Sequence, residues 1–270
     1  MMKKFMGDRA PVIKKINELE KKGEFSTHID PIHYESIIPV TEKFPYIKKT
    51  LKLKMKFWFL DNFIVKPYSF YENNFVMKTK VYGRENLKGI KNAIVTCNHV
   101  YMFDCLCCKK ALKGHKLRIT AGWFNNMNSF LGELMRADGM MPIPKDVGAL
   151  RKFNEALSIL LKKNNYILFY PETAEWWMYE KPRPFAKGAF YYASLNNVPV
   201  IPLFICFKDN KKASDKNFNI KQFNIFILKP IYPNKELSVK ENTKYLKNAA
   251  YEECVEQYEN FYHKKLEFLK

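Results

Sequence analysis

The chain has 270 residues, of which 47% are hydrophobic and 16% aromatic, with 46 lysines and arginines against 27 acidic residues. This length fits one large domain or two small ones, the apolar content is sufficient for a core, and the aromatic content argues against a disordered chain. The formal net charge of +19 suggests a polyanionic partner, either nucleic acid or an anionic membrane surface. Only six of the basic residues are arginines, so part of the charge reflects a lysine-rich composition.

The N-terminus and the longest uncharged stretch bear on compartment and topology. The N-terminus is charged and no apolar run of signal-peptide length follows it, which predicts a cytoplasmic protein. Residues 188–207 carry no charge, but two asparagines and two prolines interrupt their second half. This stretch therefore predicts a helix, a turn and a strand in place of a transmembrane helix.

Four of the six cysteines lie close together beside His99, at positions 97, 105, 107 and 108. A zinc site is one interpretation. Structural zinc sites use paired ligands two to four residues apart in two groups, whereas Cys107 and Cys108 are adjacent and a second group is missing. Buried thiols in a reducing compartment are the better interpretation, and no metal site is predicted.

Residues 1–74 predict an N-terminal helical extension, with a short helix over 12–22 and a second over 46–60. In the second helix apolar residues recur at helical spacing: Ile47, Leu51, Met55, Trp58 and Phe59. Lysines gather on its other side: Lys48, Lys49, Lys52 and Lys56. The pattern is typical of a helix in a membrane interface, and it fits equally well a helix packed on the domain with its lysines in water.

Residues 75–270 predict a single α/β domain that ends in a long helix. Strands are expected over 75–82, 93–96, 117–121, 166–170, 198–207 and 223–231. Helices are expected over 104–112, 147–163 and 188–196. This alternation favours a three-layer domain with a central mostly parallel or mixed sheet flanked by helices. A capping box at Ser238 and Glu241 opens a last helix that could run to about residue 269.

Several common sites are absent from the sequence. No two glycines are separated by a single residue, which excludes the dinucleotide-binding fingerprint, and no glycine-rich segment leads to a Walker lysine. No serine lies in a G-x-S-x-G elbow, which argues against the usual hydrolases.

His99 and Asp104 follow the strand predicted over 93–96, where open α/β folds place ligands. Asp104 also fits the N-cap of the next helix. Across a strand-to-helix bend the two side chains can face each other. A carboxylate bonded to one ring nitrogen fixes the tautomer, and the other nitrogen becomes a general base for a substrate hydroxyl. Taken alone, the pair is more often structural.

The pair belongs to the first of five sequence blocks. Asn98-His99 with Asp104, GMMPIPK over residues 139–145, FYPET over 169–173, FAKGA over 185–189 and VPVIP over 198–202 resemble, in order, the blocks of the glycerolipid acyltransferase family. VYGRENL over 81–87 also resembles the strand that opens the family's domain. The resemblance covers roughly residues 75–232.

The resemblance implies a function and roles for particular residues. His99 would be the base that deprotonates an acceptor hydroxyl, with Asp104 orienting it and Glu172 helping to form the acceptor site. The hydroxyl would attack the thioester of acyl-CoA or acyl carrier protein, with no covalent acyl-enzyme and no cofactor. The implied acceptor is a lysophospholipid, foremost 1-acyl-glycerol-3-phosphate, at the inner face of the cell membrane, where the basic chain would meet an anionic lipid surface.

Two departures from the family's blocks leave the acceptor open. Lys145 stands where the family usually has arginine, and the block at Glu172 continues Thr173-Ala174-Glu175 in place of Gly-Thr-Arg. The two missing arginines are the family's phosphate contacts, and lysine lacks the bidentate fork of arginine. Further substrate-binding candidates are Asn98, Lys145, Thr173, Trp176, Arg183, Lys187 and Gly188, with core packing as the alternative for Trp176 and Trp177.

Three hypotheses follow for the function. The first is acylation of a lysophospholipid, and the second is acylation of another hydroxyl lipid or a glycolipid by the same chemistry. The third is a basic membrane- or nucleic-acid-binding protein without catalysis. His99, Asp104 and Glu172 argue against this last hypothesis, as does the shortage of arginine for phosphate and base contacts.

Overall fold

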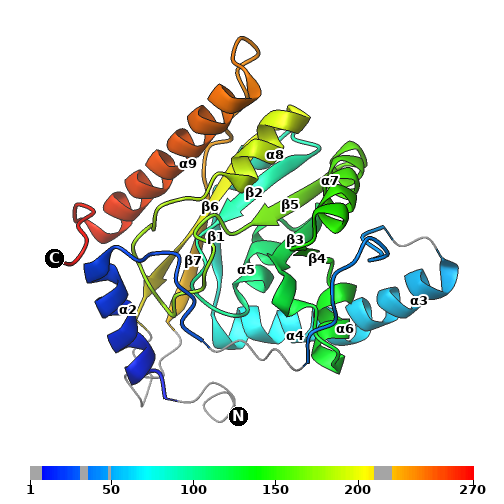
Figure 1. The fold of residues 1–270 in the computed structure, drawn as a ribbon. Coiled ribbons are helices and arrows are strands. Elements are labelled where there is room, and N and C mark those ends of the chain that lie inside the picture. Colours follow the sequence, from blue (N-terminus) through cyan, green and yellow to red (C-terminus); the bar gives the residue numbers. More distant parts are fainter. Residues whose placement is uncertain (1–7, 31–35, 48–49, 210–220) are drawn as a thin grey trace.

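A seven-stranded mixed sheet forms the centre of the molecule, as the computed structural model shows for residues 8–30, 36–47, 50–209 and 221–270 (Figure 1). Its strands are β1 (Lys80–Tyr82), β2 (Ala93–Cys97), β3 (Lys116–Gly122), β4 (Met140–Ile143), β5 (Asn165–Phe169), β6 (Val200–Lys208) and β7 (Gln222–Ile227). The order is β1-β7-β6-β2-β5-β3-β4, and every neighbouring pair is parallel except β6 and β7. The predicted α/β class with a mixed sheet is confirmed.

Helices cover both faces of this sheet. On one face α7 (Val147–Lys162) packs against β5, α8 (Gly188–Asn196) against β2 and α9 (Val239–Tyr262) against β6. On the other face α5 (Asp104–Ala111) packs against β7. Strand β2 contacts both layers: Ile94 packs in a cluster with Phe153 of α7, and Val95 in a cluster with Leu106 of α5. Side chains that alternate along a strand face opposite layers, so a strand at the centre of three layers is apolar throughout.

Most helix boundaries agree with the sequence predictions. Helix α8 has the predicted bounds, α7 ends one residue early, and the first helix, α2, spans Ala10–Lys22. The capping box of α9 is present at Ser238 and Glu241, but the helix ends at Tyr262, where His263 adopts a left-handed conformation with φ of 54°. The prediction that this helix reaches residue 269 is therefore wrong.

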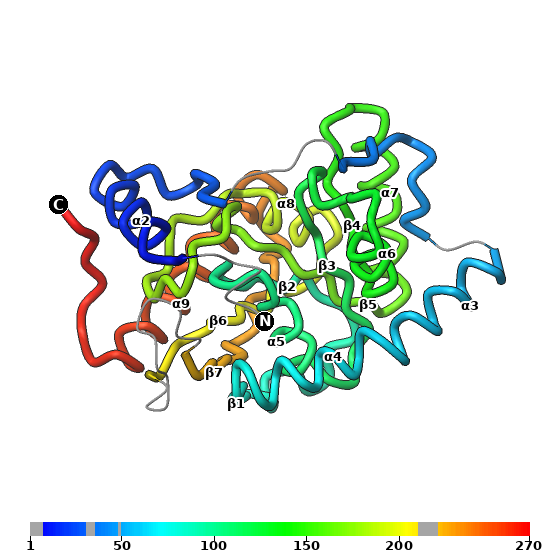
Figure 2. The backbone as a smooth tube through the Cα atoms, turned by 90° about the horizontal axis from the view of Figure 1, so that it is seen from below, coloured from blue at the N-terminus to red at the C-terminus, as the bar shows by residue number. Residues whose placement is uncertain are grey.

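The prediction of a strand over 75–82 is wrong for its first five residues. Four helical segments follow one another from residue 51 to residue 76: α3 (Leu51–Leu60), a π-helical segment (Asp61–Val65), α4 (Lys66–Tyr71) and a second π-helical segment (Glu72–Val76). We call these segments the helical rod, and Figure 2 shows α3 and α4 along one edge of the molecule. The predicted boundary at residue 74 falls within the rod's last turn, and the division into extension and domain stays a prediction.

The rod packs through a face other than the predicted apolar face. Leu53, Phe57 and Leu60 contact α6 (Phe130–Ala137), a short helix that the sequence analysis missed. Residues of the predicted apolar face are instead more than half exposed: Leu51, Met55, Trp58 and Phe59. The predicted helix start is also wrong, since α3 begins only at Leu51. Tyr46 lies outside the helix, where it is buried and its hydroxyl donates to the carbonyl oxygen of Pro142 at 2.7 Å. Lys48 and Lys49 lie outside the described residues.

Two further observations concern membranes and metals. Over the described ranges, none of the helices combines the length and the apolar character that crossing a membrane requires. Of the four clustered cysteines, Cys97, Cys107 and Cys108 are buried free thiols, as predicted, whereas Cys105 is a free thiol that is only partly buried. Among the side chains that the structure describes, no three His, Cys, Asp or Glu residues are grouped to hold a metal ion.

Candidate active site

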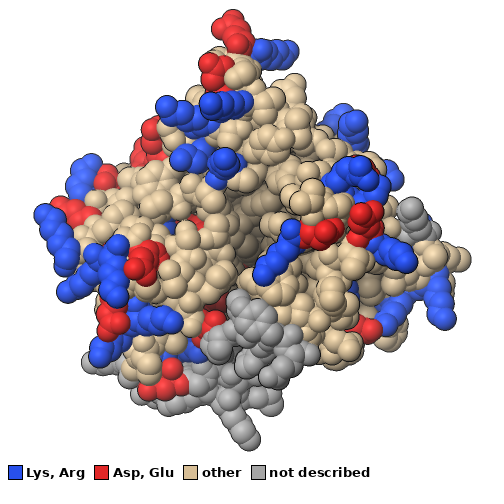
Figure 3. All heavy atoms as spheres, viewed as in Figure 1, with Lys and Arg blue, Asp and Glu red and all other residues tan. Residues whose placement is uncertain are grey.

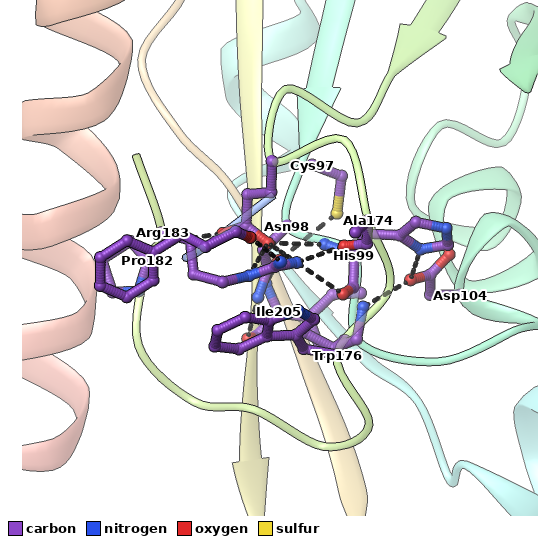
Figure 4. Close-up of polar contacts among 12 residues, drawn as sticks. Cys97, Asn98, His99, Asp104, Ala174, Trp176, Pro182, Arg183 and Ile205 are labelled. Carbon is purple, nitrogen blue, oxygen red and sulfur yellow. Dashed lines mark hydrogen bonds and ion pairs between the residues drawn. The ribbon is translucent and has the colours of Figure 1, made fainter. Parts of the chain in front are cut away.

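The candidate site lies where β2 ends and the chain turns toward α5 (Figure 4). Asn98 fixes this turn, because its side chain bonds like a strand residue to the neighbouring β6. The Nδ2 group donates to the carbonyl oxygen of Ile205 at 3.0 Å, and Oδ1 accepts from the backbone N–H of Ile205 at 2.8 Å. Asn98 is buried, and both ends of its amide bond to the backbone of Ile205, so we assign it to holding the turn, in place of the substrate contact predicted for it.

His99 and Asp104 face each other across this turn. The Nδ1 atom of His99 lies 2.8 Å from Oδ2 of Asp104, and the same oxygen accepts the backbone N–H groups of Val100 and Tyr101 at 2.9 and 3.2 Å. A buried carboxylate only accepts hydrogen bonds, so Nδ1 carries the proton and Nε2 is left to act on a substrate. Asp104 is the first residue of α5 and not its N-cap, which is Phe103. Its carboxylate instead accepts the backbone N–H groups of Val100 and Tyr101 in the preceding loop.

Charge on the His99 ring is set by two opposing effects. Burial, the largest single effect, disfavours the imidazolium and lowers the pKa. The charge and hydrogen bond of Asp104, together with the charge of Glu175, outweigh it, and the net effect raises the pKa of His99. The side chain of His99 is 24% exposed, against 1% for Asp104. The pair therefore presents a basic nitrogen at an accessible position and keeps its orienting carboxylate dry.

Tyr170 is a site residue to which the sequence analysis assigned no role. Its hydroxyl donates to Oδ1 of Asp104 at 2.6 Å. Its ring stacks on the His99 imidazole, with centroids 4.0 Å apart and planes inclined by 18°. The signal available in the sequence was a tyrosine at the end of a strand, directly before Pro171.

A buried ion pair holds the backbone of His99 on both sides. Glu172 accepts the His99 N–H at 3.1 Å and the Arg183 guanidinium at 2.7 Å from Nη2. Arg183 donates from Nη2 to the His99 carbonyl oxygen at 3.2 Å, and from Nη1 to the Phe25 carbonyl oxygen at 2.8 Å. The exposed fractions of the two side chains are 0% for Arg183 and 1% for Glu172. Both were predicted to contact the acceptor, but neither side chain reaches the surface, and we assign them to positioning His99.

Trp176 packs beneath this ion pair and is also buried. The Arg183 guanidinium carbon lies 4.6 Å from the centre of its ring, and the indole N–H donates to the Thr27 carbonyl oxygen at 3.1 Å. The prediction that Trp176 lines the acceptor site is therefore replaced by the alternative of core packing. Trp177 is buried as well.

The remaining predicted contacts lie at the surface. Lys145 is exposed, and its ammonium stands 4.0 Å from the centre of the Trp123 ring. Lys187 precedes α8 and Gly188 opens it, and both are exposed. Thr173 is exposed, with a positive φ of 69°. Because Arg183 is buried, the three predicted cations, Lys145, Arg183 and Lys187, do not share one open pocket.

Glu175 places a further carboxyl group near His99. Burial raises its pKa to about 7, and the positive charge of His99 opposes that rise. The acid therefore titrates near neutrality.

The surface over the site is hollowed and largely uncharged. Viewed as in Figure 1, the hollow lies over the region where the arrows of β2 and β5 end, and lysines and arginines lie mainly around this uncharged area (Figure 3).

Comparisons with known proteins give one family match and one structural match. A family model described as Acyltransferase matches residues 78–206. A crystal structure of the 1-acyl-sn-glycerophosphate (LPA) acyltransferase PlsC from Thermotoga maritima is similar at 16% sequence identity, with a TM-score of 0.46, over 76% of this chain and 96% of that one. No curated protein matches the chain.

Proposed function

We propose that this chain, whose residues 78–206 match the Acyltransferase family model, moves a fatty acyl group from a thioester to the hydroxyl of a lipid acceptor. The His99–Asp104 pair carries the proposal, because it combines an accessible basic nitrogen with a buried orienting carboxylate. The donor is acyl-CoA or acyl carrier protein. The acceptor we put first is 1-acyl-glycerol-3-phosphate, and another hydroxyl lipid or a glycolipid is the alternative.

The reaction needs one base and a held acceptor. Nε2 of His99 takes the proton of the acceptor hydroxyl as its oxygen attacks the thioester carbonyl carbon. The carbon–sulfur bond breaks, an ester forms, and the leaving thiolate takes a proton from the imidazolium. Asp104 keeps Nδ1 protonated and stabilises the charge on the ring throughout. A thioester is already activated, so no covalent intermediate on the chain is required.

The pH dependence of the reaction follows from the raised pKa of His99. Protonated imidazole cannot accept the hydroxyl proton, so kcat/KM should rise with pH through an apparent pKa above the ordinary 6.5. Initial rates measured between pH 5 and 9, corrected for spontaneous thioester hydrolysis, test this prediction. A midpoint below 6.5 would contradict the role of Asp104.

In Asp104→Asn the rate of acyl transfer should fall by about 10³ to 10⁴, through loss of the correct tautomer of His99.

The acceptor is settled by a panel assay. The exposed ammonium of Lys145 favours a phosphate-bearing acceptor, whereas ionised Glu175 disfavours one. We would present radiolabelled acyl-CoA or acyl carrier protein with 1-acyl-glycerol-3-phosphate, other lysophospholipids and a glycolipid. Preferred acylation of 1-acyl-glycerol-3-phosphate supports our first acceptor. Preference for a neutral or cationic head group rejects it and leaves the chemistry standing.

We also propose that the helical rod attaches the enzyme to an anionic membrane surface. Eight large apolar side chains of the rod are more than half exposed: Leu51, Met55, Trp58, Phe59, Phe63, Phe70, Tyr71 and Phe75. Lys52, Lys54 and Lys56 are exposed among them. Aromatic side chains suit the interface and lysines suit anionic lipid, so the site would work at the membrane on lipids held there.

Replacing Trp58, Phe63 and Phe70 together by serine should weaken vesicle binding roughly tenfold or more, because each buries apolar area in the interface. Sedimentation with vesicles of equal phosphatidylglycerol and phosphatidylcholine measures the binding. The matched control replaces three exposed apolar residues elsewhere, Val147, Leu195 and Tyr232, by serine. Equal loss of binding in both variants would reject the rod as the attachment surface.

A further inference from the structure

We propose that Tyr170 is a positioning residue, which through its hydroxyl limits the basicity of His99 and through its ring fixes the plane of the imidazole. The inference rests on the proposed function, in which His99 is the base. Tyr170, which directly follows β5, contacts both members of the pair: its hydroxyl bonds to Asp104 and its ring stacks on His99.

The hydrogen bonds of Asp104 show what the hydroxyl contributes. Oδ2 accepts three donors, the ring nitrogen of His99 and two backbone N–H groups, while Oδ1 accepts the Tyr170 hydroxyl. At 1% exposure this carboxylate depends on such donors, since water does not reach it. A donor on Oδ1 withdraws negative charge from the carboxylate, which then stabilises the imidazolium less strongly. His99 consequently keeps a larger neutral fraction at physiological pH.

The stacked ring supplies a second constraint. One hydrogen bond from Nδ1 holds an edge of the imidazole but allows the ring to rotate about that bond. The ring of Tyr170 covers one face of the imidazole, with centroids 4.0 Å apart and planes inclined by 18°, so the direction of Nε2 is fixed as well.

The backbone explains why Tyr170 holds this position. Strands β2 and β5 are parallel, and Thr96 pairs with Phe169, so Tyr170 leaves β5 beside the end of β2. Pro171 follows, and a residue before proline is restricted to extended conformations. Burial, with Asp104 nearby, holds the pKa of the Tyr170 hydroxyl well above its ordinary value, so it remains a donor throughout the working pH range.

Other charged groups also act on His99, and the test must leave them unchanged. Glu175 raises and Arg183 lowers the pKa of His99, Glu172 accepts its backbone N–H, and His28 interacts with it through charge. Tyr170→Phe keeps the ring and removes one oxygen, so it alters none of these groups.

The test compares Tyr170→Phe with Tyr166→Phe. Tyr166 lies on β5, the strand that Tyr170 directly follows. Its ring stacks on His115, with centroids 4.3 Å apart and planes inclined by 17°, and its hydroxyl donates to the Ile90 carbonyl oxygen at 2.9 Å. The pKa of His99 is read from the NMR titration of its ring protons, assigned with His99→Ala. In Tyr170→Phe this pKa should rise, and the acid limb of kcat/KM should move up with it. In Tyr166→Phe neither should move.

A third variant, Tyr170→Leu, removes the ring too, and its plateau kcat should fall roughly tenfold further than that of Tyr170→Phe. An unchanged His99 pKa in Tyr170→Phe, or an equal rise in Tyr166→Phe, overturns the inference. Circular dichroism establishes that each variant is folded. The titration needs no turnover, so failure of the inference differs from failure of the proposed function, in which His99→Ala would remain active.

Discussion

Replacement of His99 by alanine is expected to lower acyl transfer by a factor of about 10³ or more and to leave the fold intact, because this side chain supplies the base. The fold should survive, since the side chain is 24% exposed and its neighbours Glu172 and Arg183 bond to the backbone of residue 99. The measurements are product formation from a radiolabelled donor and the thermal midpoint of unfolding.

His115→Ala is the matched control for this variant. Like His99, His115 stacks on a tyrosine, in this case Tyr166 of β5, but it lies before β3, outside the candidate site. Its removal should leave acyl transfer within a factor of about two. Near-normal turnover in His99→Ala, with this control unaffected, would contradict the proposed mechanism.

Arg183→Met and Glu172→Gln are expected to lower the free energy of unfolding by about 3 to 5 kcal/mol each, because each leaves a buried partner without its counter-charge or hydrogen bonds. Arg183 has an exposed fraction of 0%, so no water compensates for the loss of Glu172. Urea denaturation measures the effect. Acyl transfer should fall as well, since both side chains hold the His99 backbone.

The double variant distinguishes a coupled pair from two separate contacts. Removal of both partners should cost clearly less than the sum of the single losses. The control is the surface pair Lys152 and Glu155, with side-chain exposures of 41% and 50%, where Lys152→Ala should change stability by no more than about 0.5 kcal/mol. A loss below about 1 kcal/mol for Glu172→Gln would contradict the role of the ion pair.

Local patterns account for the parts of the fold that were predicted correctly. Strand β2 could be predicted from a short apolar run. Helix α8 could be predicted from a short segment that begins at Gly188 and ends before Asn197, which adopts a left-handed conformation. The prediction failed over residues 75–79, where an apolar run belongs to the end of the helical rod. Whether Phe75 faces a sheet or ends a helix depends on what packs against it, and that information is not local.

In the candidate site, too, the local contacts could be predicted from the sequence, whereas the contacts that depend on the tertiary fold could not. His99 and Asp104 are five residues apart on one turn, so their pairing could be inferred from the sequence. The contacts of Tyr170, Glu172 and Arg183 depend on parallel pairing of β2 with β5 and on loops that meet beside these strands. Sequence position marked Glu172 and Arg183 as site residues, but it carried no signal that each would be buried against the other.

The two hydrogen bonds by which Glu172 and Arg183 hold the backbone of His99 affect how the enzyme binds its substrates. The amide hydrogen of His99 points into a buried carboxylate and its carbonyl oxygen into a buried guanidinium, so this backbone should resist hydrogen exchange although its side chain is open to solvent. The entropy of orienting the base is lost when the chain folds and not when lipid and thioester arrive. Association of the substrates then has only to order the substrates themselves.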